Sequence, residues 1–246
     1  MGLRRTFIAS TQIKEDAMTL IDTNPTLDLY REVHKGIRRA LFGFCEAAGS
    51  LDPDDASARQ AFVAGFAELE LMLTLHHGHE DDGPFGEIIG RLTPEFVEEL
   101  EAAHVTAVEG IASLRRTVTA FGAGGQNADE LYDQIVSFLS FYLGHMTFEE
   151  KTVMVALSER SNFDDLMSVE IGIRTNIAPP NMVVFMHAML PAMNPNERTN
   201  MLSGMKAGAP AEIFDIFWSA AADSLTTDEL AAVATRMDAE LATVKS

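Results

Sequence analysis

Four long amphipathic segments occupy the first 160 residues of the chain. Apolar residues recur there at spacings of three and four, which predicts helices over about residues 26–48, 57–80, 93–121 and 128–159. Short linkers containing glycine, proline and acidic residues separate these segments. Because long amphipathic helices joined by short linkers bury their apolar faces against one another, we predict an all-α fold. Its main part is an antiparallel up-down-up-down four-helix bundle over residues 26–160.

The ends of the middle helices carry clear signals. Asp81-Asp82-Gly83-Pro84 predicts a break after the second helix, and the apolar residues that follow, up to Ile89, predict a further turn or two of helix. Pro94 suits the first position of the third helix, and Gly122 begins a glycine-rich segment where that helix should stop.

The last third of the sequence has a different pattern. Prolines interrupt it, and the intervals between them predict short helices near residues 181–192, 196–206, 211–223 and 227–243. We therefore predict a helical C-terminal appendage over residues 161–246. Several methionines lie here, for which core packing is the favoured interpretation, while a pliable surface for a protein partner is the alternative.

Charge and cysteine content narrow the classes of partner. The chain carries 37 acidic and 18 basic residues, a formal net charge of −19, which repels a phosphate backbone, so nucleic acid is not expected as a partner. No apolar run reaches the roughly 18 residues of a membrane helix, and the N-terminus lacks the apolar stretch of a signal peptide. The single cysteine, Cys45, cannot form an internal disulfide, so we predict a buried thiol and a cytoplasmic protein.

Histidines are concentrated in the four-helix segment, which holds six of the seven, with at least one on each predicted helix. His76 with Glu80 and His145 with Glu149 form the pattern HxxxE, in which residues four apart share one face of a helix. Both pairs lie near the C-terminal ends of helices that run in the same direction, so they should face each other. His145 falls on an apolar stripe that is predicted to run from Leu131 to Val155.

A carboxylate that points into an apolar bundle must be paired, protonated or bound to a metal. A lone histidine on an apolar stripe is more often a core residue, but four such positions with two HxxxE pairs favour a metal site. The candidate ligands are His34, His76, Glu80, His104, His145 and Glu149. This nitrogen and oxygen ligand set suits iron, manganese or zinc.

The order His, HxxxE, His, HxxxE over four helices resembles the hemerythrin-like (HHE cation-binding) domains, over about residues 26–160. The segments HHGHEDDGPFGEII and HMTFEEKTVMVAL are similar to those that follow the metal ligands of the second and fourth helices in that family. The resemblance implies a di-iron centre held by the six candidate ligands, with Glu80 and Glu149 as bridges. It further implies a protein that binds or reacts with O2, NO or peroxide, in oxygen or redox sensing or in iron homeostasis.

The sequence departs from the oxygen-carrying members of the family. They have two histidines four apart on the third helix, whereas this chain has Leu100 and Val108 at that distance from His104. The missing ligand opens a coordination position and argues against reversible oxygen storage. His77 or His79 could replace it, although exposure near a helix end is the favoured interpretation for both.

Some alternatives remain open from the sequence. Oxygen carriers use the carboxylate five residues after the last histidine, which here is Glu150, but we prefer Glu149. The chain could instead be a metal-dependent regulatory or interaction protein, with the C-terminal helices as the responding surface, or a helical protein that binds zinc or no metal. Whether it is an enzyme is left open.

Overall fold

A computed structural model describes residues 27–125 and 127–244. Within these ranges every regular element is a helix, so the prediction of an all-α fold is confirmed. None of the helices in this part of the chain has the length and apolar character needed to cross a membrane. Thr26, where the first helix was predicted to begin, and the N-terminal segment in which no signal peptide is expected lie outside the described residues.

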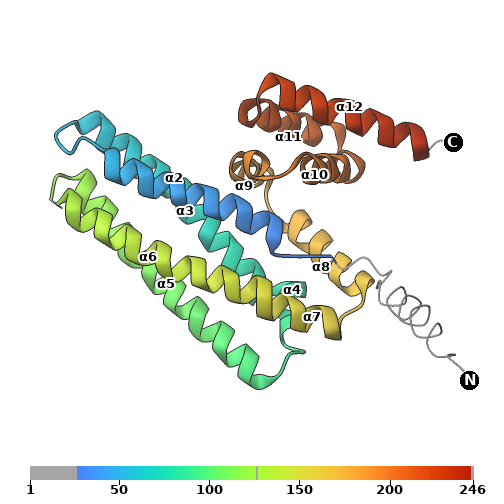
Figure 1. Cartoon of the computed structure of the whole chain (residues 1–246), viewed down its shortest axis with the longest axis horizontal. Coiled ribbons are helices and arrows are strands. Elements are labelled where there is room, and N and C mark those ends of the chain that lie inside the picture. The colour runs from blue at the N-terminus through green and yellow to red at the C-terminus, as the bar shows by residue number, and fades with distance from the viewer. Residues whose placement is uncertain (1–26, 126, 245–246) are drawn as a thin grey trace, which may run out of the picture.

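Four long helices lie side by side in Figure 1: α2 (Arg31–Ser50), α3 (Ala56–Asp81), α5 (Pro94–Gly122) and α6 (Ala128–Phe148). α2 and α5 each pack against both α3 and α6, so the four enclose a common interior. The short α4 (Gly83–Ile89) follows the predicted break after Asp81. The first helix begins at Arg31, later than predicted, because the Asp28 carboxylate accepts hydrogen bonds from the backbone of Tyr30 and Arg31 and forms a turn before it.

The fourth predicted helix is interrupted by a π-helical segment, Glu149–Val153, before it continues as α7 (Met154–Arg160). A π turn takes an extra residue, so the face directed to the core shifts along the sequence. The prediction that the apolar stripe of this helix extends to Val155 is therefore wrong at its C-terminal end. Val155 is 52% exposed, whereas Val153, Met154 and Leu157 are buried.

The C-terminal part forms five helices: α8 (Phe163–Asn176), α9 (Pro179–Ala192), α10 (Pro195–Gly208), α11 (Ala211–Ser224) and α12 (Thr227–Val244). The sequence analysis predicted the last four and missed α8, which begins with a capping box between Asn162 and Asp165. α9 packs against α2 and against α11, and α10 packs against α12. Figure 1 shows α11 and α12 as an outer layer over α9 and α10. The proposed division at residue 160 stays a prediction.

Two apolar clusters make up the core. The larger contains residues of the four long helices together with residues of α9 to α12, and the smaller joins α4, α7 and α8 with the segment before α2, the first turns of α5 and the π-helical segment. Cys45 was predicted to be buried, but it is only half-buried. It lies beside the buried stripe of α2 that includes Leu41, Phe44 and Ala48, and packs against the edge of the core.

The close approach of α9 to α2 depends on Gly36. A β-carbon added there would lie 2.6 Å from Met189 Cγ and 3.1 Å from the backbone nitrogen of Met189. Gly43 on the same helix has no atom within 4 Å of an added β-carbon. We expect Gly36→Leu to destabilise the protein by about 1–3 kcal/mol through overpacking. Gly43→Leu should be stabilising by less than about 1 kcal/mol, because leucine favours a helix more than glycine does.

Urea unfolding followed by circular dichroism measures both changes. Equal free energies of unfolding for the two variants would contradict the role given to Gly36 in the contact between α2 and α9.

Candidate metal centre

The histidines and glutamates form a polar layer between the two apolar clusters. On α2, His34 lies between Tyr30 of the smaller cluster and Ile37 of the larger one. On α5, His104 likewise lies between Leu100 of the smaller cluster and Ala107 of the larger one. All six predicted ligand residues are buried: His34, His76, Glu80, His104, His145 and Glu149. The structure therefore brings the complete predicted set together in one water-poor layer.

The first group of converging side chains contains His34, His76, Glu80 and Glu149, whose ligand atoms all lie within 4.8 Å of one another. His34 Nε2 is 3.2 Å from Glu149 Oε2, and His76 Nε2 is 3.0 Å from Glu80 Oε1. The two imidazole Nε2 atoms are 3.2 Å apart. Two histidines from α2 and α3 thus share one small space with one oxygen from each carboxylate.

The second group contains His104, His145 and Glu149. Glu149 Oε1 lies 3.0 Å from His145 Nε2 and 3.3 Å from His104 Nε2. Glu80 approaches this group as well, because its Oε2 lies 3.1 Å from His104 Nε2. Each carboxylate therefore has one oxygen beside each pair of histidines, the arrangement expected of carboxylates that bridge two ions.

Several buried polar atoms of this layer lack a hydrogen-bond partner within the described ranges, which bears on whether the layer fits a metal. Among the described residues, both nitrogens of His145, both oxygens of Glu80 and Oε2 of Glu149 are buried without a hydrogen-bond partner. Four of these atoms have an imidazole nitrogen or a carboxylate oxygen 3.0–3.2 Å away but form no hydrogen bond with it. Donor atoms at right angles around one ion, each about 2.1 Å from it, are about 3 Å apart. Burying such groups without a partner costs free energy. These donor atoms do not satisfy one another by hydrogen bonds, so their arrangement fits the binding of cations.

Acidic residues outside the layer hold two of the imidazoles. His34 Nδ1 donates to Glu150 Oε1 at 3.0 Å, and the same oxygen accepts from Arg38. His104 Nδ1 donates to Asp81 Oδ1 at 2.6 Å. A proton on Nδ1 leaves the Nε2 lone pair free to bind a metal, and such outer partners fix the ring orientation. Of the two alternatives weighed from the sequence, Glu149 thus lies inside the layer and Glu150 outside it.

The carboxylates also control the charge of these histidines. Burial alone would lower the pKa of His34, but pairing with the carboxylates of Glu149 and Glu150 outweighs burial and raises the pKa to about 9. The pKa of His104 rises to about 11 against burial, because the ring is paired with Asp81, Glu149 and Glu80. Burial opposes ionisation of Glu149, yet the facing imidazoles hold its pKa well below the usual value. Metal binding would therefore displace protons from these histidines.

His77 was expected to be exposed, and that prediction is wrong: its exposed fraction is 2%. α3 continues to Asp81, so His77 lies within the helix, where its Nε2 is hydrogen-bonded to the Tyr142 hydroxyl at 2.8 Å and its ring stacks on His104. Burial and neighbouring imidazoles lower its pKa to about 2, which keeps it neutral. His77 belongs to neither converging group, and His79 is half-buried outside them.

The sequence analysis missed the partners around the layer. Asp81 and Tyr142 each contact a histidine, and Arg38 contacts Glu150, but none of the three stands at a spacing that marks it as functional. The acidic pair after Glu80 was the one available signal, since it places Asp81 next to a ligand position.

Comparison with known proteins agrees with this geometry. The sequence matches the family model described as the Hemerythrin HHE cation binding domain over residues 26–157, which is more than half of the chain. A search of curated proteins found no match, and a search of solved structures found none. The matched range contains all six converging side chains and the helices that carry them. The chain belongs to the family of the hemerythrin HHE cation binding domain.

Proposed function

We propose that the chain is a non-haem di-iron protein that binds or reacts with O2, NO or peroxide, in oxygen or redox sensing or in iron homeostasis. The supporting observation is that Glu80 and Glu149 each place one oxygen beside each of two histidine pairs. Two histidines with a carboxylate and open positions are a ligand set typical of non-haem Fe(II). Zinc and manganese accept the same donors, so the identity of iron is part of the proposal.

In this proposal each candidate ligand has a defined role in binding the two ions. His34 and His76 would bind one ion and His104 and His145 the other, with the two glutamates shared between them. Bound iron would supply a Lewis-acidic, redox-active position for the small ligand. With both glutamates shared, each ion would have four donor atoms, fewer than the six of an octahedral ion, so ligand positions would stay open.

The surroundings suit a small uncharged ligand. Apolar clusters on both sides of the layer limit water. Tyr30 is fully buried beside His34, with ring centroids 5.3 Å apart, and its hydroxyl has no hydrogen-bond partner among the described residues. That hydroxyl is a free donor for a bound oxygen or nitrogen atom.

Three further expectations belong to this proposal. α2, α3, α5 and α6 form an antiparallel up-down-up-down bundle, supported by their short linkers and mutual contacts. Residues 26–160 form the metal-binding domain and residues 161–246 the helical appendage. The protein is cytoplasmic, in keeping with a lone free thiol at Cys45.

Metal analysis combined with absorption spectroscopy tests the function. We expect about two irons per chain after expression in iron-supplemented medium, as a two-metal site requires. The near-ultraviolet and visible spectrum of the reduced protein should change on exposure to air or NO. Stoichiometric zinc, or no metal under these conditions, would contradict the di-iron proposal. If the protein holds iron but its spectrum does not change with O2, NO or peroxide, the proposal that it binds one of these ligands is contradicted.

A metal-dependent regulatory protein is the second candidate, and one contact favours it. Lys35, next to His34 on α2, forms an ion pair with Glu197 of α10, with Nζ to Oε1 at 2.6 Å. The C-terminal helices are thus attached at the level of the metal layer. An iron-dependent change in hydrogen exchange at α10 would favour this role over simple ligand binding.

A further inference from the structure

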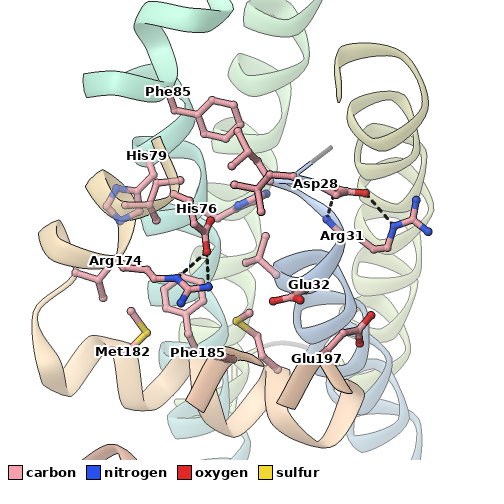
Figure 2. Close-up of a pocket in the computed structure, with 18 of the residues that line it drawn as sticks. Asp28, Arg31, Glu32, His76, His79, Phe85, Arg174, Met182, Phe185 and Glu197 are labelled. Carbon is pink, nitrogen blue, oxygen red and sulfur yellow. Dashed lines mark hydrogen bonds and ion pairs between the residues drawn. The ribbon is translucent and has the colours of Figure 1, made fainter. Parts of the chain in front are cut away.

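A chamber of about 390 Å³ lies between the long helices and the C-terminal helices, beside the candidate metal layer. Its walls come from α2, α3, α4, α8, α9 and α10 and from the segment before α2. Figure 2 shows Met182 and Phe185 at its base, with Phe85 and His79 at the opposite end. A volume of roughly 300–1,000 Å³ is typical of small-molecule sites. The chamber is therefore large enough for an organic ligand and far larger than O2 or NO requires.

Part of the apolar surface in the chamber is pliable. Met182, Met189, Met201 and Met205 line it together with Phe185. Methionine side chains are unbranched and polarizable, so they adapt to apolar and aromatic bodies of different shapes. This part of the chamber favours a ligand with a compact apolar body.

The charged residues of the chamber do not balance. Five carboxylates line it: Asp28, Glu32, Glu80, Glu170 and Glu197. Asp28 pairs with Arg31, Glu170 with Arg174, and Glu197 with Lys35. Glu80 belongs to the metal layer. Glu32 is the remaining carboxylate. No ion pair or hydrogen bond joins it to any residue of the described ranges.

Glu32 also faces the empty part of the chamber. Figure 2 shows Glu32 and Arg174 on opposite walls, with their side chains directed toward each other across the space. The Arg174 guanidinium is already held by Glu170 on its own helix, with Nη2 to Oε1 at 2.5 Å.

We propose that this chamber binds a small organic cation, an amine with an apolar body whose ammonium group pairs with Glu32 while its body packs on the methionines and Phe185. The net charge of −19 draws cations toward the protein from a distance. The proposal does not depend on the metal function. His76 and Glu80 nevertheless form part of the chamber wall, so a bound amine lies next to the candidate metal layer.

Isothermal titration of the full chain with three probes that share a 2-phenylethyl body tests the proposal: 2-phenylethylamine, 2-phenylethanol and 3-phenylpropanoate. They share an apolar body and differ in the charge of the head. We expect the amine to bind about tenfold or more tightly than the alcohol, as a hydrogen-bonded charge pair implies, and the carboxylate to bind most weakly. Metal-free and iron-loaded samples should give the same order of affinities.

Two matched variants locate the site. Glu32→Gln should weaken amine binding about tenfold and leave alcohol binding unchanged. Glu46→Gln changes the net charge equally at an exposed site on the same helix, outside the chamber, and should leave both affinities unchanged. Ile177→Trp narrows the chamber without altering charge and should weaken the amine and the alcohol alike.

Three results would overturn the assignment: no heat of binding for any probe, equal affinities for amine and alcohol, or equal amine affinities in Glu32→Gln and Glu46→Gln. Circular dichroism of each variant separates a lost ligand contact from a lost fold.

Discussion

Glu149→Gln is expected to abolish stoichiometric metal binding while leaving the helices intact. Glu149 belongs to both groups of converging ligand atoms, and its two oxygens lie beside His34 and His145 in opposite halves of the layer. A neutral amide is a poor ligand for a di-iron pair and cannot bridge two ions as a carboxylate does. One substitution therefore weakens both metal positions at once, which no substitution at a single histidine does.

Glu150→Gln provides the matched control for that experiment. The two residues are adjacent in the π-helical segment and lose the same charge, but Glu150 contacts His34 Nδ1 and Arg38 instead of the converging atoms. An outer partner of this kind typically changes metal affinity by about 10–100-fold. Plasma emission spectrometry after dialysis against competing chelator should find almost no iron in Glu149→Gln and a reduced but measurable amount in Glu150→Gln. Equal iron contents per chain in the two variants would contradict the bridging role proposed for Glu149.

The substitution should also lower the stability of the metal-free chain. Glu149 is fully buried, and its carboxylate faces the imidazoles that keep it ionised. Removing one partner of a buried charge pair leaves the facing charge uncompensated and costs about 3–5 kcal/mol. Metal-free Glu149→Gln should therefore unfold earlier than the metal-free parent, and circular dichroism at 25 °C checks that the variant is folded before its iron is counted.

The positions of the candidate ligands could be predicted because helical periodicity and burial point to the same residues. A spacing of four places His76 with Glu80, and His145 with Glu149, on one face of each helix, and the apolar residues around them direct that face inward. The level of His34 and His104 along the bundle could not be predicted, because periodicity fixes the face of a helix and not its height against its neighbours. The family resemblance and the residue pattern therefore led to the same six side chains.

Other features depend on contacts between helices, which the sequence pattern does not record. The π turn at Glu149 leaves the local composition ordinary, and its effect is seen only in the exposure of Val155. His77 is buried because Tyr142, 65 residues later, covers it. The dependence of the α2–α9 contact on Gly36 involves Met189, which lies in another part of the chain. α8 is the exception, since its capping box was present in the sequence and was overlooked.

Removing the metal is expected to lower the melting temperature by about 10 °C without unfolding the protein at 25 °C. An ion that binds only the folded chain, at a free concentration of about a thousand times its dissociation constant, stabilises it by about 4 kcal/mol. For a chain of this size each kcal/mol shifts the melting temperature by about 2–4 °C. The metal-free state should stay folded because the raised pKa values keep His34 and His104 protonated, so two positive charges face the two carboxylates of the layer.

Thermal unfolding of iron-loaded and chelator-treated protein, at equal protein concentration, measures this difference. Glu149→Gln serves as the control, since a variant that holds no metal should melt at the same temperature with and without chelator. A parent protein with identical melting temperatures in both states would show that the layer does not bind iron strongly in the folded chain. A metal-free protein that is unfolded at 25 °C would contradict the claim that protonated His34 and His104 compensate the buried carboxylates. In that case the two apolar clusters beside the layer would pack together only when the ion is bound.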